Sequence, residues 1–436
     1  MSRTATSAPA WLTARVSAPH VLVVVSLLAV GSGRVMVKSV TLGTIVAVAL
    51  LPIWWRPVRD LVGIRTLVGL GGLAAVVGVW LTWFHEADHA TSTNLLVGNT
   101  STVLDAVLGA AVVAWARTVL RDPVVAAWFG VGMLLGISTG GRFLENPWRF
   151  GFSVPLIVLL LGLAWTSGRG WLQVVTALGL AGVSVMNGGR STSAMLVLAA
   201  AVTIQQTARR ATTRAGSRVR ALLIITSLVA ALYQLGQVAI LDGYLGQDAQ
   251  ERTEAQIALS GSLLAGARPE SGATRALVVA HPSGFGSGTL PGTRDVFVAK
   301  TGMAELNYDP HNGYVEKYMF GSGFELHSTA ADLWVRFGFA GVLLALWAAW
   351  LVVRGYTGAI ATHTASALLT YLAVRTLWNL AFSPLSSSTT LLALTLGLLA
   401  VRRVAASSPP DLTGEVVEQV SDDERGARPE RSLPAR

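Results

Sequence analysis

The sequence predicts an all-α polytopic membrane protein with about twelve transmembrane helices and one large external loop. Of its 436 residues, 52% are hydrophobic and only 13% are charged, about half the charged share of an ordinary soluble domain. Apolar runs such as Ser153–Trp165 and Ala221–Ile240 recur at lengths suited to crossing a bilayer. A single long polar segment, Asp242–Ala330, interrupts these runs and is predicted to be the external loop.

A helix needs roughly 20 mostly apolar residues to cross the hydrocarbon core. On this criterion the spans are predicted near 17–33, 39–55, 66–84, 101–117, 123–138, 151–167, 170–187, 192–206, 221–241, 331–353, 365–382 and 385–402. The loop, predicted to be partly helical, then falls between the ninth and tenth helices. Loops of this length in compact proteins usually carry function or are disordered. Its aromatic residues, close glycines and three histidines favour an ordered, functional loop.

Basic residues gather in alternate loops, as the positive-inside rule requires. With the N-terminus inside, the predicted cytoplasmic loops contain Arg56, Arg59, Arg65, Arg117, Arg121, Arg169, Arg209, Arg210, Arg214, Arg218, Arg220, Arg402 and Arg403. Arg34 and Lys38 oppose the pattern. The net charge of +9 is therefore attributed to basic residues in cytoplasmic loops, and no nucleic-acid partner is predicted. The pattern predicts a multi-pass protein of the cytoplasmic membrane with both termini cytoplasmic. The predicted parts are a cytoplasmic leader (1–16), helices one to nine (17–241), the external loop (242–330), helices ten to twelve (331–402) and a disordered cytoplasmic tail (403–436).

Cysteine is absent, which excludes disulfides, thiolate metal sites and a cysteine nucleophile. His281, His311 and His327 in the loop are far apart and lack the short spacing of a zinc site. No metal and no cofactor are predicted. A single loop histidine more often has an exposed structural role than a catalytic one.

Arg190 is the strongest candidate among the cations predicted at the outer face. It follows Gly188-Gly189, which permits close approach of the backbone to a ligand. The Ser-Thr-Ser sequence after it is able to cap the next helix, whose N-terminus favours an anion. The alternative is an arginine that snorkels to lipid headgroups.

Four further arginines allow the same two interpretations. Arg336 and Arg375 lie inside predicted spans, where a cation normally faces the bundle interior or a cavity. Arg336 is near the outer end of its span, and a bond to a helix carbonyl is an equal alternative for Arg375. Arg142 and Arg149 lie in the predicted outer loop 139–150.

Three local patterns, in order, resemble the O-antigen ligase family. Gly189-Arg190-Ser191 resembles its Ser-Arg-Gly segment, although glycine replaces the common serine. Arg268, followed by His281-Pro282 and the glycines of 284–288, resembles its arginine, proline and Gly-x-Gly turn, without the usual tryptophan. His327-Ser328, followed by the Gly-x-x-Gly of 338–341, resembles its His-Asn and Gly-x-x-Gly. A complete His-Asn pair occurs at His311-Asn312, but only His327 keeps the distance to Gly-x-x-Gly, so His327 ranks first and His311 second.

The resemblance implies a GT-C-like membrane enzyme that moves a glycan from undecaprenyl pyrophosphate to an acceptor hydroxyl at the outer face, as a ligase or polymerase of cell-envelope polysaccharide. It implies metal-independent transfer with inversion of the anomeric centre. Arg190 and Arg268 would stabilise the departing pyrophosphate, and His327 would be the base. Arg336, His311 and Arg142 are additional candidates for substrate binding.

Two other functions remain open from the residues. A secondary transporter or lipid-linked glycan flippase fits many spans and buried arginines, although the unequal halves of the chain speak against it. A scaffold for envelope assembly would use the loop for docking. A transporter requires critical residues near the midplane, whereas a glycosyltransferase requires them at the outer face.

Overall fold

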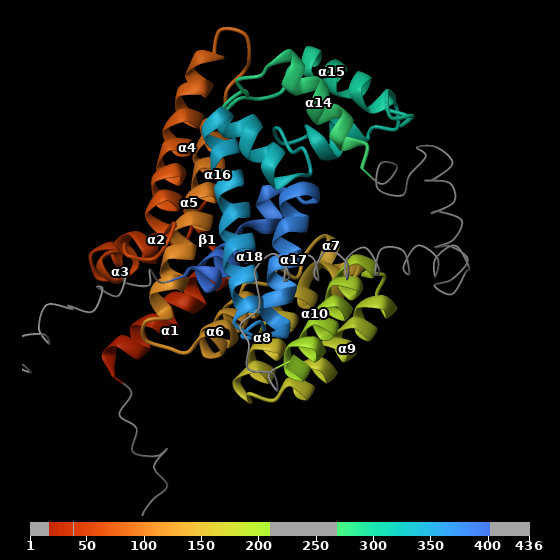
Figure 1. Ribbon diagram of the computed structural model, residues 1–436. Helices are drawn as coiled ribbons and strands as arrows, with labels where there is room; N and C mark the ends of the chain where they lie inside the picture. The colour runs from red at the N-terminus through yellow and green to blue at the C-terminus, as the bar shows by residue number, and fades with distance from the viewer. Residues whose placement is uncertain (1–16, 38, 210–267, 402–436) are drawn as a thin grey trace, which may run out of the picture. The chain divides into compact units, whose positions relative to one another are not determined.

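The computed structural model describes residues 17–37, 39–209 and 268–401, and this part of the chain is mostly helical (Figure 1). A short antiparallel hairpin joins β1 (Val35–Val37) and β2 (Val40–Thr41). The helices before residue 210 are α1 (Ala18–Ser32), α2 (Leu42–Ala49), α3 (Leu51–Val58), α4 (Ile64–Phe84), α5 (Thr93–Ala116), α6 (Asp122–Leu135), α7 (Arg142–Glu145), η1 (Trp148–Phe152), α8 (Ser153–Thr166), α9 (Gly170–Met186) and α10 (Arg190–Arg209). Those after residue 267 are α14 (Glu270–Ala280), α15 (Thr293–Ala304), η2 (Val315–Met319), α16 (Thr329–Ala361), α17 (Ala367–Phe382) and α18 (Leu385–Leu399).

Among the described residues, four helices are long and apolar enough to cross a membrane: α4, α5, Trp148–Thr166 and α16. Shorter apolar helices of 10–17 residues accompany them: α1, α6, α9, α17 and α18. The helical class and the presence of membrane-suited helices are therefore confirmed. The count of twelve spans stays a prediction. The predicted ninth span (221–241), the leader and the tail lie outside the described residues.

The predicted second span, 39–55, is two helices instead of one. α2 ends at Ala49, the φ of −94° and ψ of 8° at Leu50 are not helical, and α3 begins directly after Leu50. Pro52 follows within the first turn of α3. Proline lacks an N–H and restricts the residue before it, so a continuous helix is disfavoured at this point.

Close approach of backbones characterises the helix packing. α5 packs along α18, α6 against α1 and α8, α4 against α16, and α9 against α10. Where α1 crosses α6, a Cβ atom on Gly132 would lie 2.8 Å from the carbonyl oxygen of Leu28. Small residues at such crossings are typical of helices that associate in lipid.

The segment 268–328, here called the loop segment, forms its own apolar core on α14, α15 and η2. Its glycine-rich stretch 284–288 joins it to α4 and α16. The N–H groups of Phe285 and Gly286 donate to the Val335 carbonyl at 2.8 and 3.1 Å. Gly286 has a φ of +116°, and a Cβ there would lie 2.4 Å from the Thr82 nitrogen. Only glycine fits this position, so the Gly-x-Gly pattern anchors the loop segment to the helices.

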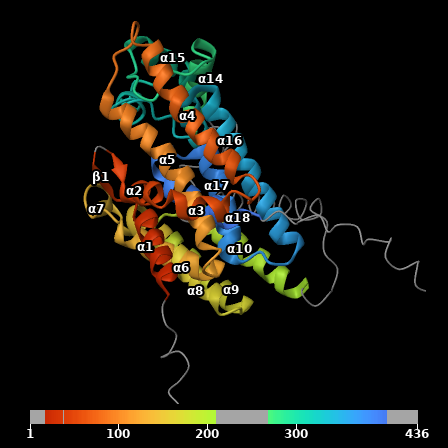
Figure 2. The ribbon, with the colours of Figure 1, turned by 90° about the vertical axis from the view of Figure 1, so that its left-hand side faces the viewer.

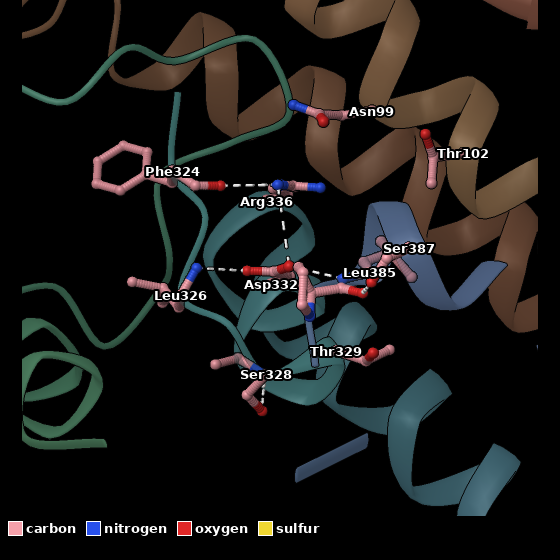
Figure 3. A network of polar contacts seen from close by, with 12 residues as sticks. Asn99, Thr102, Phe324, Leu326, Ser328, Thr329, Asp332, Arg336, Leu385 and Ser387 are labelled. Carbon is pink, nitrogen blue, oxygen red and sulfur yellow. Dashed lines mark hydrogen bonds and ion pairs between the residues drawn. The ribbon is translucent and has the colours of Figure 1, made fainter. Parts of the chain in front are cut away.

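Asp332 joins the loop segment, α16 and α18 (Figure 3). Its fully buried carboxylate accepts hydrogen bonds from the N–H groups of Leu326 at 2.7 Å and Leu385 at 2.8 Å. The Arg336 guanidinium lies 4.0 Å away and donates two hydrogen bonds to the Phe324 carbonyl, at 3.2 and 2.8 Å. The Asp332 carboxylate thus holds both the loop segment, through Leu326, and the start of α18, through Leu385, against α16.

We expect Asp332→Ala to be strongly destabilising. It would leave two buried N–H groups without an acceptor and a buried guanidinium without its counter-charge, a loss of about 3–5 kcal/mol. Thermal unfolding of detergent-purified protein should show a large fall in Tm. Glu305→Ala is the control, because Glu305 pairs with Arg275 on the surface, with side chains 55% and 77% exposed; an unchanged Tm in Asp332→Ala would contradict the assignment.

Two histidines contact Asp295, and a third, His85, lies beside them where the segment after α4 meets the loop segment. His89 Nε2 lies 3.0 Å from Asp295 Oδ2, and His281 Nε2 lies 3.8 Å from Oδ1. His85 Nε2 lies 3.1 Å from the Gly284 carbonyl oxygen, and its ring is 5.7 Å from that of His89. Asp295 is buried and also accepts a hydrogen bond from Gly292 N–H at 2.7 Å.

This junction should weaken in acid. Burial first, and then the neighbouring His89, lower the pKa of His85; the Gly284 carbonyl and Asp88 oppose them, while His281 adds to the lowering. The folded state therefore binds fewer protons at His85 than the unfolded chain does. Stability is unaffected well above the ordinary histidine pKa near 6.5 and falls as the pH drops from there toward the folded pKa. Tm measured from pH 8 to pH 5 should fall less in His85→Gln than in the wild type; equal slopes would contradict this.

Candidate active site

Two hydrogen bonds fix the start of α16 against the C-terminal end of α17, near Phe382. Ser328 Oγ donates to the Leu380 carbonyl at 2.9 Å, and Thr329 Oγ1 donates to the Ser383 carbonyl at 2.9 Å. Ser328 also caps α16 by accepting from Ala331 N–H at 3.3 Å. Ser328 thus makes a helix cap. These bonds hold the preceding residue, His327, at the end of α17.

His327 has a φ of +55°, in the left-handed region. Residues other than glycine adopt this region infrequently, and they do so more often at functional sites. Its Nδ1 is buried and has no hydrogen-bond partner within the described part of the chain. Its ring centroid lies 6.0 Å from that of Tyr314. The backbone around His327 is therefore fixed while its imidazole is not committed to a structural hydrogen bond at Nδ1.

Arg268 reaches the same place from the start of α14. Its guanidinium carbon lies 5.6 Å from the centre of the Phe382 ring, and its charge acts on Tyr314. Tyr314 in turn donates a hydrogen bond of 2.7 Å to Glu270 Oε1. We call Arg268, Glu270, Tyr314, His327 and Phe382 the α17-end cluster. It contains an arginine, a histidine and a phenol from three separate segments.

Burial and neighbouring groups raise two pKa values here, that of the Tyr314 phenol in the cluster and that of the Glu325 carboxyl group outside it. Burial, followed by the hydrogen bond to Glu270, raises the pKa of Tyr314, so its hydroxyl stays protonated. Burial, followed by Asp332, raises the pKa of Glu325, whereas His327 and Arg336 oppose that rise. Glu325 is thus close enough to His327 for their charges to interact. A carboxylate there would stabilise an imidazolium formed on His327.

A cavity of about 310 Å³ lies farther along α17 and is lined by Arg375, Asn379 and Phe150, among others. Arg375 Nη1 donates to Thr192 Oγ1 on α10 at 3.1 Å. Arg375 Nε and Asn379 Oδ1 are buried without a hydrogen-bond partner in the described residues. Two residues that line the cavity thus each have a buried polar atom that the described part of the chain leaves without a partner.

Arg190 is exposed at the first residue of α10, two residues before Thr192. It thus lies beside the middle of α17, near Arg375, and within the described part of the chain it makes no contact with Arg268. Arg375 and Phe382 are seven residues apart, or about 10 Å along the helix. The structure brings Arg268 and His327 together through Tyr314 and places Arg190 on a neighbouring helix of the same α17.

The remaining candidates lie elsewhere. Arg336 is buried and bonded to the Phe324 carbonyl. The guanidinium carbons of Arg142 and Arg149 lie 4.4 and 5.4 Å from the Phe150 ring, which lines the Arg375 cavity. His311 is exposed. Among the described residues, no group of three or more His, Cys, Asp or Glu is arranged to hold a metal ion.

Comparison of the chain with protein-family models, with curated proteins and with solved structures gave no match.

Proposed function

We propose that the protein is a membrane glycosyltransferase of the O-antigen ligase type, which moves a glycan from undecaprenyl pyrophosphate to an acceptor hydroxyl at the outer face of the cytoplasmic membrane. The observation that supports this most is the α17-end cluster, in which Arg268 and His327 both lie near Tyr314. The order and sidedness of the sequence patterns support it further.

The cluster has the groups that one displacement needs. The acceptor oxygen bonds to the anomeric carbon, and its proton passes to the His327 imidazole. The bond between the anomeric carbon and the pyrophosphate oxygen breaks, and the electron pair leaves with undecaprenyl pyrophosphate. Arg268 stabilises the charge that grows on this leaving group through paired N–H donors, and Arg190 assists from α10. A single displacement inverts the anomeric centre.

A flippase or transporter is the second candidate, and the Arg375 cavity favours it. A cation with an uncommitted donor inside a helix bundle is a common feature of transport pathways. In that function Arg375 would bind the substrate in passing, and no covalent bond would change.

Reconstitution distinguishes the two. Purified protein is placed in proteoliposomes made with membrane lipids from a strain that lacks the gene for this protein. These lipids supply both the lipid-linked glycan and its acceptors, and EDTA is present. The transferase produces free undecaprenyl pyrophosphate and a glycan on a new carrier, both measured by mass spectrometry. A glycan that stays on its lipid while crossing the bilayer would overturn the proposal in favour of transport.

A further inference from the structure

A second cavity, of about 260 Å³, lies between α1, α2, α5 and α18, beside the β1–β2 hairpin. Figure 2 shows α1, α2 and β1 beside α5, and these elements are in contact. Six hydroxyl side chains line the cavity: Ser39, Thr41, Thr102, Ser386, Thr389 and Thr390. Asp105 is the one ionisable residue among the lining residues. It belongs to α5, a helix suited to crossing a membrane, where a carboxylate is costly and usually functional.

One oxygen of Asp105 is committed to the fold and the other is available. The hydroxyls of Thr41 and Thr44 both donate to Oδ1. Oδ2 has no hydrogen-bond partner among the described residues. The threonine bonds hold the carboxylate in place, so Oδ2 is a fixed acceptor for a ligand in the cavity.

The hydroxyl groups divide into acceptors and donors. Thr102 Oγ1 already donates to the Gly98 carbonyl, and Thr389 Oγ1 to the Leu385 carbonyl, both at 2.8 Å, so each offers lone pairs to a ligand. The side chains of Ser386 and Thr390 make no hydrogen bond to another described residue and are able to donate as well as accept. Among the described residues that line it, this cavity has a carboxylate and no cation, which disfavours an anion and favours a neutral ligand rich in hydroxyls.

Size separates a polyol from a metal cation. A cation site closes around the ion with oxygens at about 2.3–2.6 Å. This cavity has room for several water molecules, each of which takes about 30 Å³ in the liquid. Its volume suits one sugar ring, whose hydroxyls donate to carboxylates and exchange hydrogen bonds with serine and threonine.

We infer that this cavity, the Asp105 pocket, binds a sugar ring. It shares Thr390 with the Arg375 cavity, so an uncharged ligand and a charged one would be held on two sides of the same α18 residue. That the sugar belongs to one of the transfer substrates rests on the proposed function; the binding itself does not.

Ligand-induced stabilisation tests the inference. Protein purified in lauryldimethylamine oxide, whose headgroup is not a sugar, is unfolded thermally with D-glucose, D-galactose, D-mannose, L-rhamnose or D-ribose. Glycine betaine at equal osmolality corrects for excluded-solute effects. At least one sugar should raise Tm by about 3 °C or more beyond betaine, because a ligand that binds only the folded state stabilises it.

Asp105→Asn should abolish the shift while leaving the sugar-free Tm close to the wild-type value, since the asparagine oxygen is still able to accept from Thr41 and Thr44. Thr395→Val, on α18 but outside the pocket lining, should keep it. The inference is overturned if no sugar raises the Tm of the wild type beyond betaine, or if Asp105→Asn keeps the sugar-induced rise. It is also overturned if exchanging choline chloride for NaCl in the buffer changes the Tm of the wild type but not of Asp105→Asn, because the pocket would then bind a cation. A sugar shift in protein that transfers no glycan would overturn only the proposed function.

Discussion

Replacing Arg268 with alanine should lower kcat/KM for glycan transfer by about 100- to 1,000-fold, the usual effect of removing one donor to a developing anion. Arg268 lies against Phe382 and acts on Tyr314, so its loss removes the permanent cation of the α17-end cluster. Arg268→Lys should recover only part of the rate, because an ammonium group does not make the paired contacts of a guanidinium. Radiolabelled transfer at several donor concentrations measures both variants.

Arg275→Ala is the matched control. It lies on α14, the helix that follows Arg268, and its side chain is 77% exposed in a surface pair with Glu305. Its removal changes the net charge of the loop segment as much as Arg268→Ala does, so general electrostatics would affect the two equally. Equal losses in the two variants would mean that Arg268 acts through charge alone and not through a defined site.

Replacing His327 with asparagine should lower kcat about 100- to 10,000-fold, the range for loss of a general base. Asparagine is the suitable replacement because it tolerates the left-handed backbone that His327 adopts at φ +55°. Folding should therefore be retained, which an unchanged Tm would verify. Single-turnover transfer measures the chemical step.

His311→Asn serves as the control and also decides between the two candidate bases. His311 is exposed, and its N–H donates to Asp309 Oδ1 in a turn. We expect its loss to leave the rate within about 2-fold of the wild type, as surface changes usually do. If His311→Asn is inactive and His327→Asn is active, the base has been assigned to the wrong histidine.

Much of the helical framework could be predicted from hydropathy alone. The predicted spans 66–84, 170–187 and 365–382 end within two residues of α4, α9 and α17. Apolar length is a local property, so it is visible in one dimension. The break at Leu50 is not visible in the hydropathy, because Pro52 lies within an apolar run.

The candidate site was predicted only in part, since its geometry depends on contacts distant in sequence. Arg268 and His327 were chosen from patterns that resemble a family. Tyr314 was not predicted, although it lies three residues after His311, the second candidate for the base. Its hydrogen bond to Glu270 spans 44 positions, and nothing in the local sequence announces it.

Asp332 and Asp105 were missed for the same reason. Each is a single acidic residue in an apolar stretch. The candidate residues predicted inside the spans were arginines, because lysine and arginine determine topology. Asp332 binds Leu385, 53 positions away, and Asp105 binds Thr41, 64 positions away. An acidic residue inside a predicted span is the signal that would have found both.

The central claim is that Arg268 holds the departing pyrophosphate while His327 acts only on the acceptor proton. Binding of undecaprenyl pyrophosphate to the purified wild type, Arg268→Ala and His327→Asn tests it most directly. Arg268→Ala should raise the Kd about 10-fold or more, since a hydrogen bond to a charged group contributes about 1.5–3 kcal/mol. His327→Asn should bind within about 2-fold of the wild type and still fail to transfer. A wild-type Kd in Arg268→Ala would contradict the account.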